Sequence, residues 1–170
     1  MICKLGLDEI PDELESYPRI TYIECSYNNL VKFPSQVILN NLNALTELYL
    51  DYNNIEKLPP EIVFLQHLKV LSVNYNRLQE LPPKIGQIST LEILSIQGNL
   101  GLNTLPPSIC ELKRLTRFSH DQREFVIPGD MIRDFFSNIF SPIEQRRKIA
   151  YLVKTYLELF DNFNVTFLPR

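Results

Sequence analysis

The sequence predicts an α/β solenoid, in which short strands from successive repeats stack in parallel between two terminal caps. Three near-copies of one unit begin at Leu45, Leu68 and Leu91, the first two 23 residues long and the third 24. They share the pattern L-x-x-L-x-L-x-x-N-x-L-x-x-L-P-x-x-I-x-x-L. A fixed period in this range is typical of a repeat array, because one repeat alone cannot bury its apolar face. The rest of the chain is therefore expected to extend and cap this array.

Extending the repeat register in both directions predicts a single domain. Residues 1–19 match only the second half of the unit, as expected of a half-repeat cap that has a neighbour on one side only. Residues 115–127 carry a degenerate last strand and a loop, and 128–170 have the apolar spacing of a helical C-terminal cap. The full repeats between them run over 20–44, 45–67, 68–90 and 91–114.

Each unit contains signals for a strand, a turn and a return path. The L-x-L alternation predicts a short strand with one side facing the core. An asparagine follows each strand, where its amide can bond to backbone groups that the turn leaves unpaired. The proline of each L-P-x-x-I favours an extended residue before it and prevents a long helix. Cys25 occupies an inward position of this pattern, so we expect a buried and inert thiol.

Composition indicates a soluble protein that does not bind nucleic acid. A net charge of −3 and a pI of about 5.4 give no general attraction to phosphate backbones. Three cysteines form neither an even set nor a dense framework, which favours a reducing compartment. The sequence contains no apolar run of signal-peptide or transmembrane type. We therefore expect a monomeric, cytoplasmic protein.

Catalytic and cofactor chemistry finds little support in the sequence. His120 beside Asp121 is the one acid/base pair, and no serine or cysteine is placed by the sequence as its nucleophile. The cysteines and histidines lack metal-ligand spacing, and there is no glycine-rich phosphate loop. We expect a non-enzyme without cofactor, metal or catalytic residues. A hydrolase-like activity around His120 is the competing hypothesis.

The repeats resemble the intracellular class of leucine-rich repeats found in Ras-group and Scribble-type scaffolds and in bacterial effectors. This resemblance covers roughly residues 5–120. It implies a protein-protein interaction module, and it implies that the strand positions between the leucines line a concave face. If the protein is a bacterial effector acting on a host protein, the resemblance implies delivery into the host cytosol.

By that resemblance, the side chains between the leucines form candidate binding columns. Tyr27, Tyr52 and Tyr75 recur in register, and such amphipathic rings are enriched at recognition hot spots. The alternative is that these tyrosines only shield the turn. If they point away from the core, truncating one should change stability by no more than about 0.5 kcal/mol. The carboxylates in the columns form either a solvated face or a surface that attracts a basic partner segment. The complete predicted partner-binding set is Tyr22, Glu24, Tyr27, Glu47, Tyr49, Asp51, Tyr52, Asn74 and Tyr75.

A second functional alternative concerns the C-terminal segment. The run Arg146, Arg147 and Lys148 lies within a predicted helix. It forms either a solvated face or a contact with an acidic partner or a membrane surface. The latter would make the protein a targeting or regulatory subunit rather than a module with a single concave binding face.

Overall fold

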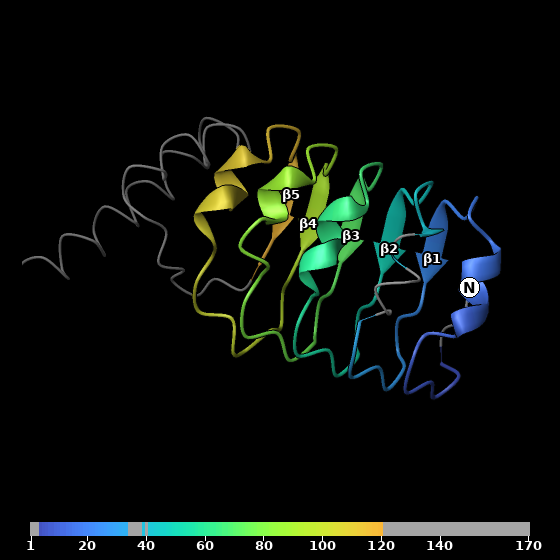
Figure 1. Ribbon diagram of the computed structural model, residues 1–170. Helices are drawn as coiled ribbons and strands as arrows, with labels where there is room; N and C mark the ends of the chain where they lie inside the picture. Colours follow the sequence, from blue (N-terminus) through green and yellow to red (C-terminus); the bar gives the residue numbers. More distant parts are fainter. Residues whose placement is uncertain (1–3, 34–38, 40, 121–170) are drawn as a thin grey trace, which may run out of the picture.

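The computed structural model describes residues 4–33, 39 and 41–120, and these residues form a solenoid with one parallel sheet. Each coil contributes one strand, and neighbours along the chain are neighbours in the sheet, as Figure 1 shows. The expectation of parallel strands in a leucine-rich solenoid is therefore confirmed, whereas the predicted cap at 128–170 lies outside the described residues. The strands are β1 (Tyr22–Glu24), β2 (Glu47–Tyr49), β3 (Val70–Ser72), β4 (Ile93–Ser95) and β5 (Arg117–Ser119).

The return paths are short 3-10 helices, as the prolines predict. Pro59 and Pro106, each with φ of −68°, precede helical turns that themselves begin with a proline. These turns end after three to five residues, so the chain can re-enter the sheet one coil later. The turns of successive coils contact each other in the same order as the strands. They are η1 (Asp12–Ser16), η2 (Pro60–Phe64), η3 (Ile85–Gln87) and η4 (Pro107–Glu111).

A continuous apolar core runs along the coil between the strands and the helical turns. The middle residue of each strand points into it, and Leu48, Leu71 and Leu94 are almost completely buried. Cys25 is also fully buried at the predicted inward position, among leucines of neighbouring coils. Since every coil adds the same set of inward residues, the core continues from one repeat to the next.

The asparagine of each repeat connects consecutive coils. The Asn76 side-chain nitrogen donates to the carbonyl oxygens of Val73 at 3.2 Å and of Leu50, in the preceding coil, at 2.9 Å. Its oxygen accepts a hydrogen bond from the Ile55 backbone nitrogen at 2.9 Å. Asn53 makes the equivalent contacts one coil earlier. The predicted structural role of these asparagines is therefore correct.

The first residues of the N-terminal cap bond to the first full repeat as a preceding coil would. Lys4 donates its backbone N–H to the Tyr27 carbonyl at 3.2 Å. The backbone nitrogens of Leu5 and Leu7 donate to the Asn28 side-chain oxygen at 3.1 and 3.2 Å. Residues 4–7 thus occupy the place that a preceding repeat would take, and they use the hydrogen-bonding groups that the first full repeat presents.

Candidate functional site

The solvent-facing positions of β1 and β2 bring two tyrosines and two glutamates together. Parallel pairing places Tyr22 beside Glu47, and Glu24 beside Tyr49. The residues between them, Ile23 and Leu48, point into the core, so these four side chains share the opposite face of the sheet. We call this group of four side chains the aromatic–acidic surface.

Contacts within the aromatic–acidic surface hold the rings and carboxylates in a defined arrangement. The rings of Tyr22 and Tyr49 lie diagonally across the two strands, with centroids 5.6 Å apart and planes at 47°. The Tyr49 hydroxyl donates to a Glu47 carboxylate oxygen at 3.0 Å, and the Tyr22 hydroxyl to Glu24 at 3.5 Å. The second Glu24 oxygen accepts from the Ser26 backbone nitrogen at 2.9 Å.

Burial and the neighbouring glutamates make the Tyr49 hydroxyl harder to ionise than an ordinary tyrosine. Partial burial, the hydrogen bond to Glu47 and the charges of Glu47 and Glu24 raise the pKa of Tyr49 to about 12. Burial disfavours a tyrosinate because it removes water from the charged form, and the two glutamates disfavour it because it would add a third negative charge beside them. The surface therefore offers aromatic rings next to negative charge, a combination that favours a cationic side chain.

Asp51 and Asn74 are part of the predicted set, but the structure uses both to link coils. One Asp51 carboxylate oxygen accepts from the Ser72 hydroxyl at 2.7 Å and from the Asn74 backbone nitrogen at 2.6 Å. The Asn74 side-chain oxygen in turn accepts from the Gln97 backbone nitrogen at 2.8 Å. Burial raises the pKa of Asp51, although its hydrogen bonds act in the opposite direction. These bonds run from coil to coil, so both side chains contribute to stability as well as to the surface.

The three recurrent tyrosines form a stacked column, which we call the tyrosine ladder. The ring of Tyr52 lies between those of Tyr27 and Tyr75, with centroids 4.5 Å away on either side and planes within 10° of parallel. All three residues lie just beyond the strands and have positive φ, between 52° and 58°. Their rings remain about half exposed. The ring faces therefore cover one another, while part of each tyrosine remains accessible to solvent.

Two residues at the ends of the tyrosine ladder were not part of the predicted set. The Lys4 ammonium lies 5.3 Å from the Tyr27 ring centroid, a cation–π contact. Lys4 also has positive φ and stands one repeat before Tyr27, so the 23-residue period could have identified it. At the other end, a Cβ on Gly98 would lie only 2.5 Å from the Tyr75 ring. A glycine is thus required where the last ring rests on the backbone.

The residues of the competing catalytic hypothesis are only partly described. The His120 ring packs against Phe118, with centroids 4.9 Å apart, whereas Asp121 lies outside the described residues. Within residues 4–33, 39 and 41–120, no group of three or more His, Cys, Asp or Glu side chains could hold a metal ion.

The basic run at 146–148 also lies beyond the described part of the chain. Over that same part, none of the helices has the length and apolar character needed to cross a membrane.

Comparisons with known proteins identify the repeats. A family model described as leucine rich repeat matches residues 43–100. No curated protein matches the chain. Among solved structures, a plant peptide hormone receptor, RGFR1 in complex with RGF2, is 26% identical over 83% of this chain, with a TM-score of 0.70. The ectodomain of the Arabidopsis thaliana receptor kinase GASSHO1/SCHENGEN3, in complex with CASPARIAN STRIP INTEGRITY FACTOR 2, is 23% identical over 66%, with a TM-score of 0.50. This chain spans 23% and 17% of the lengths of those two proteins.

Proposed function

Because this chain is a leucine-rich-repeat protein, we propose that it is a non-catalytic module that binds a protein or peptide partner through its aromatic–acidic surface. One observation carries the proposal: Tyr22, Glu24, Glu47 and Tyr49 lie side by side on the solvent face of β1 and β2. The ring pair stabilises the sheet, but two carboxylates on adjacent strands repel each other, which a cationic partner would relieve. RGFR1, with which the chain shares this fold, is a peptide hormone receptor, and this supports a peptide or protein as the partner class.

The chemistry of the surface favours a partner segment that carries arginine or lysine. Glu47 accepts a hydrogen bond from the Tyr49 hydroxyl and Glu24 accepts one from the Ser26 backbone nitrogen, so both carboxylates are held before a ligand arrives. Such preorganisation reduces the entropy lost on binding. A guanidinium or ammonium group could contact a ring face and a carboxylate together, combining a cation–π contact with an ion pair. The tyrosine ladder, which begins a few residues after β1 and β2, would add aromatic area beside this contact.

A selection experiment tests the proposal. A random peptide library is panned on the wild-type protein, and selected peptides are then measured by fluorescence anisotropy against a Glu24→Gln, Glu47→Gln double variant. Glutamine keeps a hydrogen-bond acceptor at each position but removes the charge. We expect arginine- or lysine-containing peptides whose affinity falls at least about tenfold in the variant, since pairs of this kind contribute 1.5–3 kcal/mol each.

The matched control is a Glu56→Gln, Glu80→Gln variant, which removes the same charge from exposed residues that line a different groove. Its affinity for the selected peptides should stay within about twofold of wild type, because screening weakens distant charges. Peptides that bind all three proteins equally, or a selection that yields no basic residues, would contradict the assignment of this surface.

A further inference from the structure

A cleft of about 580 Å³ follows the edge of the sheet at which the strands begin. It is separate from the aromatic–acidic surface, and its lining comes from successive coils. Lys69 and Arg114 supply positive charges, His67 also lines the cleft, and no carboxylate is among the lining residues. Pro18, Thr46 and Thr90 also line the cleft. The cleft is therefore positive locally in a protein whose net charge is −3.

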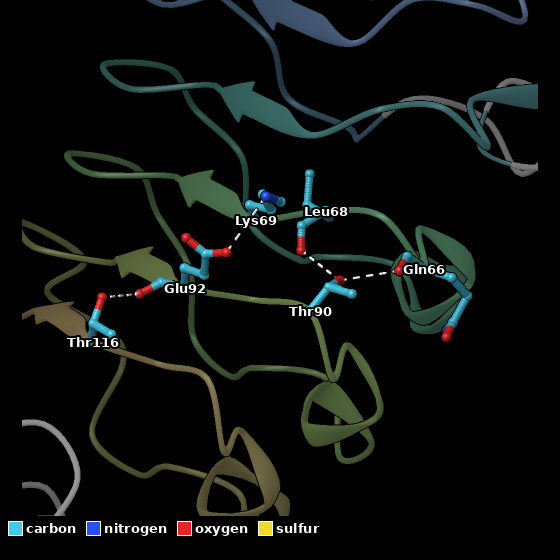
Figure 2. A network of polar contacts seen from close by, with 6 residues as sticks. All are labelled: Gln66, Leu68, Lys69, Thr90, Glu92 and Thr116. Carbon is cyan, nitrogen blue, oxygen red and sulfur yellow. Dashed lines mark hydrogen bonds and ion pairs between the residues drawn. The ribbon is translucent and has the colours of Figure 1, made fainter.

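Threonine side chains fix the spacing of the coils along this edge. The Thr46 hydroxyl donates to the Thr21 carbonyl at 2.8 Å, and the Thr90 hydroxyl to the Leu68 carbonyl at 2.8 Å. Thr116 makes a similar contact with the Glu92 carbonyl at 3.2 Å. Figure 2 shows the Thr90 and Thr116 bonds, each of which joins one coil to the next. The backbone that carries the basic side chains is thus held in place without a ligand.

One carboxylate lies next to the cleft and would compete with a ligand. Glu92 approaches the Lys69 ammonium at 3.6 Å, as Figure 2 shows, and both side chains are about half exposed. An ion pair with this exposure contributes little, so the lysine can exchange Glu92 for another anion. Removing the Glu92 charge should therefore make the cleft more attractive to an acidic ligand.

We propose that this cleft binds an acidic, extended segment of a partner polypeptide, independently of the aromatic–acidic surface. Its lining reaches from Pro18, before β1, to Arg114, before β5. With strands roughly 4.8 Å apart, this span is on the order of 19 Å, the length of about six residues of extended chain. Charge complementarity selects an occupant rich in aspartate or glutamate. The negative charge of the protein as a whole disfavours nonspecific binding of such a segment.

A labelled hexaglutamate peptide with neutral flanks, measured by fluorescence anisotropy at low salt, is the probe. We expect a Lys69→Gln, Arg114→Gln double variant to bind it about fivefold more weakly, since each exposed charge contributes roughly 1.4-fold to fivefold. We expect Glu92→Gln to bind it about twofold to fivefold more tightly than wild type. Thermal unfolding of each variant verifies that the fold is retained, and Lys69→Gln alone serves if the double variant is unstable.

A second exposed ion pair, Lys57 with Glu80 at 3.8 Å, supplies matched controls away from the cleft. A Lys57→Gln, Lys84→Gln variant changes the net charge as the cleft variant does, and Glu80→Gln matches Glu92→Gln. Both controls should leave hexaglutamate affinity within about twofold of wild type. The proposal is overturned if the controls act as strongly as the cleft variants, if Glu92→Gln fails to tighten binding, or if an oligonucleotide of equal charge binds more tightly than the peptide.

Discussion

The ring of Tyr52 lies against the ring of Tyr75 with centroids 4.5 Å apart and planes at 10°, although the two residues come from different coils. Both residues also have positive φ, a backbone conformation that is unfavourable for a side chain of this size. The stack therefore offsets a local backbone cost. This relationship means that the tyrosines bind one another whether or not they also bind a partner.

The stack changes the expected effect of truncating a ladder tyrosine. Tyr52→Ala removes two ring contacts, each contributing about 0.5–1.5 kcal/mol, while alanine keeps the unfavourable backbone conformation. We expect a loss of about 1–3 kcal/mol in urea unfolding, more than the 0.5 kcal/mol limit that the sequence suggested. Tyr52→Phe keeps the ring and should stay within about 0.5 kcal/mol of wild type. An alanine variant as stable as the phenylalanine variant would show that stacking contributes nothing.

Asn76→Ala should destabilise the solenoid by leaving a buried backbone N–H unpaired. The substitution leaves the buried Ile55 N–H without its acceptor. The Leu50 and Val73 carbonyls lose one donor each but keep the side-chain amides of Asn53 and Asn99. We expect a loss of about 1–3 kcal/mol in the free energy of unfolding. Asn43→Ala, at an exposed position, is the control and should change stability by less than about 0.5 kcal/mol. Equal effects of the two substitutions would contradict the structural role of Asn76.

Asp51 should make stability depend on pH in the direction opposite to that of a salt-bridged carboxylate. Burial raises the pKa of Asp51 in the folded protein, so its stabilising contribution is complete below the unfolded pKa of about 3.9 and is lost as pH rises through the folded value. Asp51→Asn keeps an acceptor for Ser72 and Asn74 but cannot ionise. Relative to wild type, this variant should gain stability between about pH 3.5 and pH 7 in urea unfolding. A stability difference that moves the other way would mean that the hydrogen bonds outweigh burial.

Glu47→Gln should lower the pKa of Tyr49 from about 12 toward its ordinary value of 10.0. The substitution removes the negative charge next to the hydroxyl and weakens the hydrogen bond, although the larger effect of burial remains. Alkaline titration followed by tyrosinate absorbance measures the change, with a Tyr49→Phe variant identifying the signal. The control is Glu80→Gln, because Glu80 lines a different groove, and it should leave the Tyr49 signal unchanged. If the pKa of Tyr49 is the same in the Glu47→Gln variant as in wild type, the hydrogen bond between Tyr49 and Glu47 does not form in solution.

The sequence by itself determined the parts of this protein that repeat. The leucine spacing specifies which side chains of β2 to β4 enter the core, because alternate residues of a strand face opposite sides. The same register placed Cys25 in the interior and Asn76 between coils, since equivalent positions of stacked repeats meet equivalent surroundings. It also placed Glu24 and Tyr49 in one outward column, where the structure pairs them.

Only the tertiary structure decided what neighbouring coils do with their outward side chains. Asp51 was predicted as part of a binding surface, but its carboxylate bonds to the next coil, a contact that depends on rotamers rather than on the period. The basic cleft combines His67 and Arg114 with Lys69 from different coils. The sequence of a single repeat does not reveal this cleft, because its lining comes from several coils. Residues at outward positions differ between repeats, whereas packing restricts the residues at core positions. Which outward residues become neighbours is set by the stacking of the coils, about 4.8 Å apart, and by the directions their side chains then take.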